Sequence, residues 1–333
     1  MEGMGKTNRV KQNKLKNNVL AISNDPGGAE ALSSYLRHRG KEHSRFRCVA
    51  QGFAKKIFIS KGLGKYLIDT KKGKELILKG HIDLLLASTG RSSDLSTNFI
   101  ALAKSHSIKT VTILEHWLGY KERFGYPSRD WRSNLPDEIW VVDKLARKIA
   151  EKEFGKAARI KIKPNFYFKD LRAEYSKSSA SKDRRYFNVL FLNQPILKKI
   201  ASKKKKIKIT EIGKVTKLIN FMKTMNCSRP IRFTIRQHPI ESRSGFAEVV
   251  KGNTDCSNFR VVLSDPSRNS LVEDVKSADV VIGIQSSALT IASLFKKTIC
   301  CCDKPPLWLS AYNVKHIRPN LSGLEHFIYG RRK

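Results

Sequence analysis

The stretch of residues 277–295 constrains the fold most strongly, because it predicts a buried strand that runs directly into a helix. Four apolar residues lie close together here: Val280, Val281, Ile282 and Ile284. Such a run is typical of a strand in a parallel sheet that is covered by helices on both faces. Ser286 and Ser287 follow, and serine is a common cap for a helix such as the apolar one expected next. Hydroxyl groups at a helix N-terminus suit a phosphate, although the two serines alternatively serve only as caps.

A second strand is predicted upstream of this segment. Apolar residues alternate along residues 231–235, and the strand then delivers three polar side chains, Arg236, Gln237 and His238. Pro239 prevents continuation as a central strand. Ligands of open α/β sheets bind at the carboxyl ends of strands, so these side chains are candidates for a binding site.

Strands and helices alternate along most of the chain, which predicts an α/β protein built from two doubly wound halves. Residues 1–17 are polar and basic and are expected to form a disordered arm. The first half is predicted over residues 18–162, and the Ser/Lys-rich residues 163–187 are expected to form a linker. The second half follows over residues 188–318, and residues 319–333 predict a short basic helix.

The charge of the chain is strongly positive, with 65 basic and 29 acidic residues and a formal net charge of +36. Such a field attracts polyanions, and peripheral contact with an anionic membrane is one expected consequence. The alternative is a solvated surface of dispersed lysines. The sequence contains no zinc-finger spacing and no helix-turn-helix pattern, so specific nucleic-acid binding is not expected.

The six cysteines indicate neither a metal site nor a disulfide framework. Three of them are consecutive at residues 300–302, where cysteine acts as a small hydrophobe in a predicted buried strand. The sequence has no secretory signal and no run of about 18 apolar residues. A cytoplasmic location is therefore expected, with any membrane contact at the inner face.

The order of the two motifs resembles the nucleotide-binding half of GT-B glycosyltransferases. A strand ending in His-Pro is followed, some forty to fifty residues later, by a strand ending in Ser-Ser, as in bacterial sialyl- and polysialyltransferases and teichoic-acid glycerophosphotransferases. The resemblance implies a GT-B fold, with two Rossmann-like domains facing each other across a cleft. It also implies that His238, Ser286 and Ser287 hold the phosphates of a nucleotide-sugar donor. Arg236 and Gln285 are plausible neighbours, and Asn193-Gln194 ends another strand beside the donor or forms a turn.

The first half resembles the acceptor domain of the same enzymes. Three segments carry this likeness, ASTG at residues 87–90, the stretch around residues 104–124, and LPDEIWVVD at residues 135–143. The resemblance places the acceptor near five residues: Gly27, Gly28, Ser88, Thr89 and Arg123. A Gly-rich turn lets a ligand approach the backbone closely, whereas Arg123 alternatively pairs with Glu122 or Asp130 on the surface.

The general base has two candidate positions at predicted strand ends. Asp25 lies in the Gly-rich turn, and its alternative role is that of a turn or helix cap. Glu115-His116 ends another strand, and a histidine beside a carboxylate is poised to titrate near neutral pH. His116 alternatively is a structural residue packed under Trp117.

The favoured hypothesis is a metal-independent, inverting glycosyltransferase that moves a sugar from a nucleotide-sugar to a surface polysaccharide or glycolipid. The expected donor is of the CMP/CDP or UDP type, no other cofactor is expected, and the acceptor is an anionic glycan or glycolipid. The sequence has no DxD-like metal pair, in keeping with that class. A CDP-glycerol-type polyol-phosphate transferase and a non-enzymatic polyanion-binding protein are the alternatives. A sugar-nucleotide 2-epimerase shares the fold but needs a set of acidic catalytic residues that the sequence does not locate.

Overall fold

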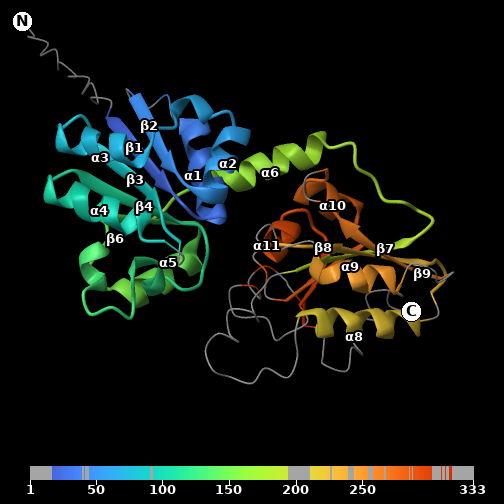
Figure 1. Cartoon of the computed structure of the whole chain (residues 1–333). Helices are drawn as coiled ribbons and strands as arrows, with labels where there is room; N and C mark the ends of the chain where they lie inside the picture. The colour runs from blue at the N-terminus through green and yellow to red at the C-terminus, as the bar shows by residue number, and fades with distance from the viewer. Residues whose placement is uncertain are drawn as a thin grey trace, which may run out of the picture. The chain divides into compact units, whose positions relative to one another are not determined.

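The chain forms two compact units, Met1–Tyr167 and Phe168–Lys333, called unit 1 and unit 2 below (Figure 1). The computed structural model describes residues 17–39, 41, 45–90, 93–193, 211–225, 227–238, 244–253, 258–265, 268–284, 286, 288–301, 309, 312 and 315–316. Both units are α/β structures with a parallel sheet, so the predicted fold class is confirmed.

Unit 1 contains a six-stranded sheet in the order β2-β1-β3-β4-β5-β6. Its strands are β1 (Asn18–Ser23), β2 (Arg45–Ala50), β3 (Leu84–Ser88), β4 (Lys109–Leu114), β5 (Glu138–Val141) and β6 (Arg159–Ile162). Its helices are α1 (Pro26–Arg39), α2 (Gly52–Ser60), α3 (Thr70–Leu78), α4 (Leu95–Ser105) and α5 (Lys144–Phe154). Three short 3-10 turns complete it: η2 (Gly64–Tyr66), η3 (Lys121–Phe124) and η4 (Trp131–Asn134).

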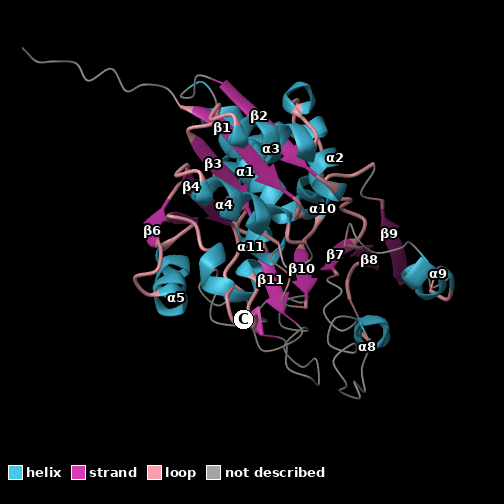
Figure 2. Ribbon diagram, turned by 60° about the vertical axis from the view of Figure 1, so that its left-hand side comes forward, coloured by secondary structure: helices cyan, strands magenta, loops and turns pink. Residues whose placement is uncertain are grey.

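Helices cover both faces of the sheet in unit 1 (Figure 2). On one face, Leu32 of α1 and Phe58 of α2 belong to the buried cluster that includes Val19 of β1. On the other face, α3 lies close against β2. A Cβ atom on Gly73 of α3 would lie only 2.7 Å from Cγ2 of Val49 in β2. Burial on both faces explains why these strands are continuous apolar runs.

Unit 2 contains a second six-stranded sheet, in the order β12-β11-β10-β7-β8-β9. Its strands are β7 (Phe187–Leu192), β8 (Ile231–Arg236), β9 (Phe259–Ser264), β10 (Val280–Gly283), β11 (Thr298–Cys301) and β12 (Lys315–His316). Its helices are α8 (Glu211–Lys223), α9 (Ser244–Lys251), α10 (Leu271–Ser277) and α11 (Ala288–Ser293). The helix α6 (Phe166–Lys177) contains the boundary between the two units.

The sheet of unit 2 is also covered on both faces. Helices α8 and α9 lie on one side and α10 and α11 on the other (Figure 1). Phe191 and Phe233 form the centre of the cluster under α8 and α9, with ring centroids 6.1 Å apart. Both side chains are fully buried.

The segment predicted as a polar linker, residues 163–187, contains helix α6. Leu171 on this helix is buried, and Lys276 Nζ donates to two carbonyl oxygens at the end of α6, Tyr175 O at 2.8 Å and Ser178 O at 2.6 Å. A cation at a helix C-terminus is favourable because it opposes the negative end of the macrodipole. The expected arm, except for residue 17, and the expected C-terminal helix lie outside the described residues.

Candidate functional site

The strand order of unit 1 has a switch point between β1 and β3. Because the chain runs from β1 to β2 on one side and to β3 on the other, the connections diverge at the carboxyl ends of β1 and β3. Such a switch point is where open α/β sheets bind ligands. Asn24 and Asp25 follow β1, Ser88 ends β3, and Glu115 follows the neighbouring strand β4. Strand β4 ends one residue before Glu115, so Glu115 and His116 lie in the loop rather than in the predicted strand.

Asp25 is half-buried at the start of α1. Its Oδ2 atom accepts a hydrogen bond of 3.2 Å from the Gly28 N–H, so it acts as a helix cap. Burial raises the pKa of the Asp25 carboxyl, and the charge of Glu115 raises it further. Arg123 and the N–H groups of Gly28 and Gly27 oppose this shift without cancelling it. A carboxyl of raised pKa at a switch point of the sheet is a candidate for proton transfer.

Gly27 occupies the point between the two carboxylates. A Cβ atom on this exposed glycine would lie 3.2 Å from Glu115 Oε1 and 3.5 Å from Asp25 Oδ2. Both carboxylates therefore border the same small space, which the missing side chain leaves open. Gly28 allows close packing of α1 against β3. A Cβ atom at this position would lie only 2.6 Å from Ser88 Oγ and would push the helix away from the strand.

Arg123 is buried and forms a two-point ion pair with Glu115. Arg123 Nη1 lies 3.0 Å from Glu115 Oε2, and Nη2 lies 3.0 Å from Glu115 Oε1. Arg123 Nη1 also donates to the Thr89 carbonyl oxygen at 2.7 Å. The alternative of a surface pair with Glu122 or Asp130 is therefore wrong, because Arg123 is only 8% exposed and pairs with Glu115 instead. No pattern in the sequence indicates Glu115 as the partner of Arg123, because Glu115 follows β4 and Arg123 lies in η3, eight residues further along.

His116 has structural contacts in the same loop. Its Nδ1 atom accepts a hydrogen bond of 3.1 Å from the Leu118 N–H, and its ring lies 5.9 Å from that of Trp117. The Trp117 indole donates to the Asp143 carboxylate at 3.0 Å. These contacts favour the structural alternative for His116.

Several buried polar atoms gather at the same strand ends. Ser88 Oγ donates to Ser23 Oγ at 2.8 Å, so this predicted acceptor residue is used inside the unit. Among the described residues, four buried atoms near these strand ends have no hydrogen-bond partner: Asn24 Nδ2, Thr89 Oγ1, Tyr120 Oη and Arg123 Nε. An unsatisfied buried polar atom costs about 1–3 kcal/mol, so each of these atoms is a candidate for a hydrogen bond to a ligand or to a bound water. Sequence reasoning missed Asn24 and Tyr120, although Asn24 directly precedes Asp25.

Unit 2 has its own switch point, between β7 and β10. Asn193 follows β7, His238 lies shortly after β8, and Ser286 lies shortly after β10. These strands are consecutive in the order β10-β7-β8 and are parallel, so the outer two lie roughly 10 Å apart at strand spacing. Asn193, Ser286 and the neighbouring Gln237 are buried, and His238 is half-buried. The structure therefore brings these polar residues to one edge, while Gln194, Gln285 and Ser287 lie outside the described residues.

Arg236 is engaged inside unit 2. Its Nη1 atom donates to Asp274 Oδ2 at 2.5 Å and to the Asn269 carbonyl oxygen at 3.0 Å. The guanidinium thus fastens β8 to α10. Ser286 Oγ accepts a hydrogen bond of 3.2 Å from the Ala288 N–H, as a helix cap does. This contact uses a lone pair and leaves the hydroxyl hydrogen able to donate to a ligand.

Within the described residues, no group of three or more His, Cys, Asp or Glu side chains is placed to hold a metal ion. The same part of the chain contains no helix that is long and apolar enough to cross a membrane.

The raised pKa of Asp25 predicts a pH-dependent effect of Asp25→Asn on stability. Because the folded-state pKa lies above the unfolded value, ionising Asp25 lowers the stability of the folded state as the pH rises. Asparagine keeps the helix cap but cannot ionise. We expect Asp25→Asn to melt above the wild type at pH 7, and the difference to vanish at pH values below the ordinary carboxyl pKa of 3.8.

Thermal unfolding of both proteins across this pH range measures the effect. The exposed Asp94→Asn substitution is a suitable control, since Asp94 makes no side-chain cap hydrogen bond at the start of α4. A variant no more stable than the wild type at pH 7 would show that Asp25 is not destabilised by its surroundings.

Comparisons with known proteins identify the fold. No family model and no curated protein matches the sequence. The structure is similar to a UDP-GlcNAc 2-epimerase from Methanocaldococcus jannaschii, with a TM-score of 0.61, 13% identity, and coverage of 95% of this chain and 93% of that chain. The enzyme of the same name from Neisseria meningitidis, bound to UDP-GlcNAc, gives a TM-score of 0.62 at 10% identity, covering 94% and 92%. A glycosyltransferase from Rickettsia africae gives a TM-score of 0.56 at 12% identity, covering 94% and 88%. The chain therefore has the two-unit GT-B fold over nearly its whole length.

Proposed function

We propose that this protein is a glycosyltransferase that moves a sugar from a nucleotide-sugar donor to a hydroxyl group of a polysaccharide or glycolipid. The observation that carries the proposal is the pair of carboxylates, Asp25 and Glu115, on either side of the open position at Gly27. Proteins of similar fold include one solved with UDP-GlcNAc and one solved with UDP-glucose, which supports a nucleotide-sugar as the donor.

The two carboxylates have different roles in this proposal. Both oxygens of Glu115 are bound by Arg123, which fixes Glu115 in place. Among the residues that the structure describes, Asp25 forms no ion pair, and burial raises the pKa of its carboxyl. A base works best when its pKa approaches the working pH, so Asp25 is the preferred general base over Glu115 and His116. Glu115 acts as a positioning residue that raises the proton affinity of Asp25.

The reaction follows as a single displacement. Asp25 takes the proton of the acceptor hydroxyl, and the oxygen forms a bond to the anomeric carbon of the donor sugar. The bond from that carbon to the phosphate oxygen breaks, and its electron pair leaves with the nucleotide. We assign the leaving phosphate to His238, to the Ser286 hydroxyl and to backbone N–H groups, so that protein groups rather than a metal ion offset its charge. Attack opposite to the leaving group inverts the anomeric centre.

A sugar-nucleotide 2-epimerase is the second candidate, and the position of two carboxyl groups in unit 1 supports it. Inverting one carbon by proton transfer needs two acid–base groups around one point, and Asp25 and Glu115 border one. The solved epimerases of similar fold lend this candidate further support. Incubation with UDP-GlcNAc in the absence of acceptor separates the two: an epimerase inverts C2 without releasing nucleotide, whereas a transferase releases nucleotide only with acceptor.

A nucleotide screen tests the donor site. We expect one of CMP, CDP, UDP or GDP to raise the melting temperature, because a ligand at a hundred times its Kd stabilises by about 2.7 kcal/mol. CMP or CDP would point to sialyl or polyol-phosphate donors.

The variant His238→Ala should reduce this shift in melting temperature, since each lost hydrogen bond to phosphate weakens binding about ten- to a hundredfold. The exposed His81→Ala in unit 1 is the control. An unchanged shift in His238→Ala would remove His238 from the donor site.

The substitution Gly27→Ala tests the acceptor site. Its methyl group would occupy the space between Glu115 and Asp25, and we expect donor turnover to fall by roughly a hundredfold, as for other small misplacements of reacting groups. Gly64→Ala is the matched control, because its methyl group would make only an ordinary contact of 3.6 Å with Ile59. Full activity in Gly27→Ala, measured as nucleotide release, would contradict the placement of the acceptor.

A further inference from the structure

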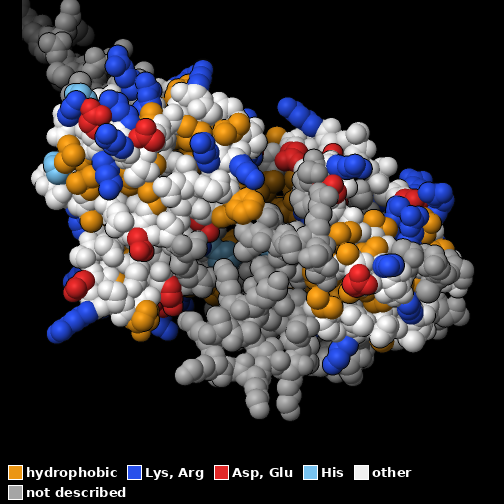
Figure 3. Space-filling model, viewed as in Figure 1, with side chains coloured by type: hydrophobic (Ala, Val, Ile, Leu, Met, Phe, Trp, Pro, Cys, Tyr) orange, Lys and Arg blue, Asp and Glu red, His pale blue; other side chains and the backbone are white. Residues whose placement is uncertain are grey.

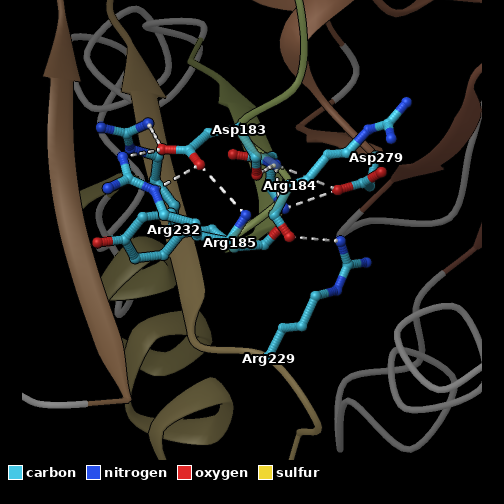
Figure 4. A network of polar contacts seen from close by, with 8 residues as sticks. Asp183, Arg184, Arg185, Arg229, Arg232 and Asp279 are labelled. Atoms are coloured by element: carbon cyan, nitrogen blue, oxygen red, sulfur yellow. Dashed lines mark hydrogen bonds and ion pairs between the residues drawn. The ribbon is translucent and has the colours of Figure 1, made fainter.

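The net charge of +36 is not explained by the proposed reaction. Lys and Arg side chains are spread over the viewed faces of both units, with acidic side chains among them (Figure 3). One group of arginine side chains differs from this scatter, because hydrogen bonds and contacts with aromatic rings hold its members in place. It lies at the amino ends of β7 and β8 in unit 2, and Figure 4 shows it from close by. We call Arg185, Arg229 and Arg232 the arginine cluster.

Asp183 organises the arginine cluster. Its carboxylate accepts hydrogen bonds from Arg185 Nε at 3.0 Å and Arg185 Nη2 at 2.8 Å, and Arg232 Nη1 lies 3.4 Å away (Figure 4). These hydrogen bonds lower the pKa of Asp183 to about 2, with Arg185 as the largest cause. The carboxylate therefore stays charged at every pH near neutrality, and the contacts of the cluster do not depend on pH there.

Two aromatic rings support the same guanidinium groups. Arg185 and Arg232 lie over the Tyr186 ring, at 5.7 and 5.2 Å from its centroid. Arg229 lies 5.8 Å from the centroid of Phe187, and its Nη1 donates to the Arg184 carbonyl oxygen at 3.3 Å. Contacts of this kind limit the freedom of long side chains, so less entropy is lost when a ligand binds.

The surroundings of the arginine cluster are positive and accessible. Five basic side chains surround two acidic ones, with Lys182 paired to Asp279 at 2.7 Å and Arg184 exposed beside it. The side chain of Arg185 is 82% exposed, although it pairs with Asp183. The hydrogen bonds described above use only some of the five N–H groups of each guanidinium, and the other N–H groups can reach a ligand.

The arginine cluster is separate from the candidate donor residues. Strand β8 starts at Ile231, beside the cluster, and His238 lies beyond its other end. A strand of this length spans roughly 20 Å. A ligand of the cluster therefore does not compete with a nucleotide at the carboxyl edge.

We propose that the arginine cluster docks this protein on the phosphate groups of an anionic phospholipid surface. Guanidinium groups match phosphate oxygens in two-point hydrogen bonds, and three of them lie here on one small area. A nucleic-acid strand fits less well, because single-stranded binding sites rely on open aromatic faces for stacked bases. Here Tyr186 and Phe187 each have at least one face occupied by arginine.

Vesicle co-sedimentation of the full chain tests this docking surface. We expect binding to phosphatidylcholine vesicles that contain about 30 mol% phosphatidylglycerol, and weak binding to phosphatidylcholine alone. At roughly 1 kcal/mol for each basic residue near the surface, one lost charge lowers the partition coefficient about fivefold. Arg185→Gln should show this loss, and the triple variant Arg185→Gln/Arg229→Gln/Arg232→Gln should lose about a hundredfold.

A matched variant separates the arginine cluster from overall charge. Arg172→Gln/Lys217→Gln/Lys223→Gln removes the same number of charges from exposed positions of unit 2. It should lose much less binding than the triple arginine variant. Equal losses in the two variants would overturn the proposal, and so would tighter binding to a single-stranded RNA that the arginine variant abolishes. The single variant Arg185→Gln replaces a side chain that is 82% exposed, so its result stands even if the triple variant unfolds.

Discussion

Parallel pairing of the strands is the constraint on which the rest of the structure depends. Every pairing between the named strands in the described part of the chain is parallel, in both units. Parallel strands need crossover helices, and these cover both faces of each sheet. They also bring all carboxyl ends to one edge, so that residues far apart in sequence, such as Asp25, Ser88 and Glu115, lie together. The proposed chemistry is located at these edges because the buried faces of the sheets are filled with apolar side chains.

Within unit 1, the buried ion pair of Arg123 and Glu115 sets the electrostatics of the edge. Breaking such a pair leaves an uncompensated buried charge, which typically costs about 3–5 kcal/mol, so the loop carrying η3 is held firmly against β3 and β4. Glu115 is paired with Arg123, yet its charge still raises the pKa of Asp25. One carboxylate is thereby held in an ion pair, and the other has a raised pKa. Two carboxyl groups of different proton affinity at one point are a common arrangement for acid–base chemistry.

The sequence predicts more of the fold than of the candidate site. Apolar runs such as Val19–Ile22 and Val280–Ile282 identify buried strands because burial on both faces leaves little room for polar residues. Strand β6 was missed, because Arg159 and Lys161 alternate with its two isoleucines at the edge of the sheet. Helix α6 was missed because its buried surface is small, with Leu171 as its buried residue. At the site, Asp25 and Glu115 were recognised at strand ends, but the partner of Arg123 was not, since a contact across a loop has no periodic signal in sequence.

Hydrogen–deuterium exchange with and without the stabilising nucleotide-sugar tests most directly whether the carboxyl edges of the sheets are the substrate site. Ligand binding slows exchange of the backbone amides that it orders or shields. If the carboxyl edges are the substrate site, exchange slows after β1, β3 and β4 in unit 1 and after β7, β8 and β10 in unit 2, with no change at the amino ends near Arg45 or Arg185. Protection confined to the amino ends would contradict it.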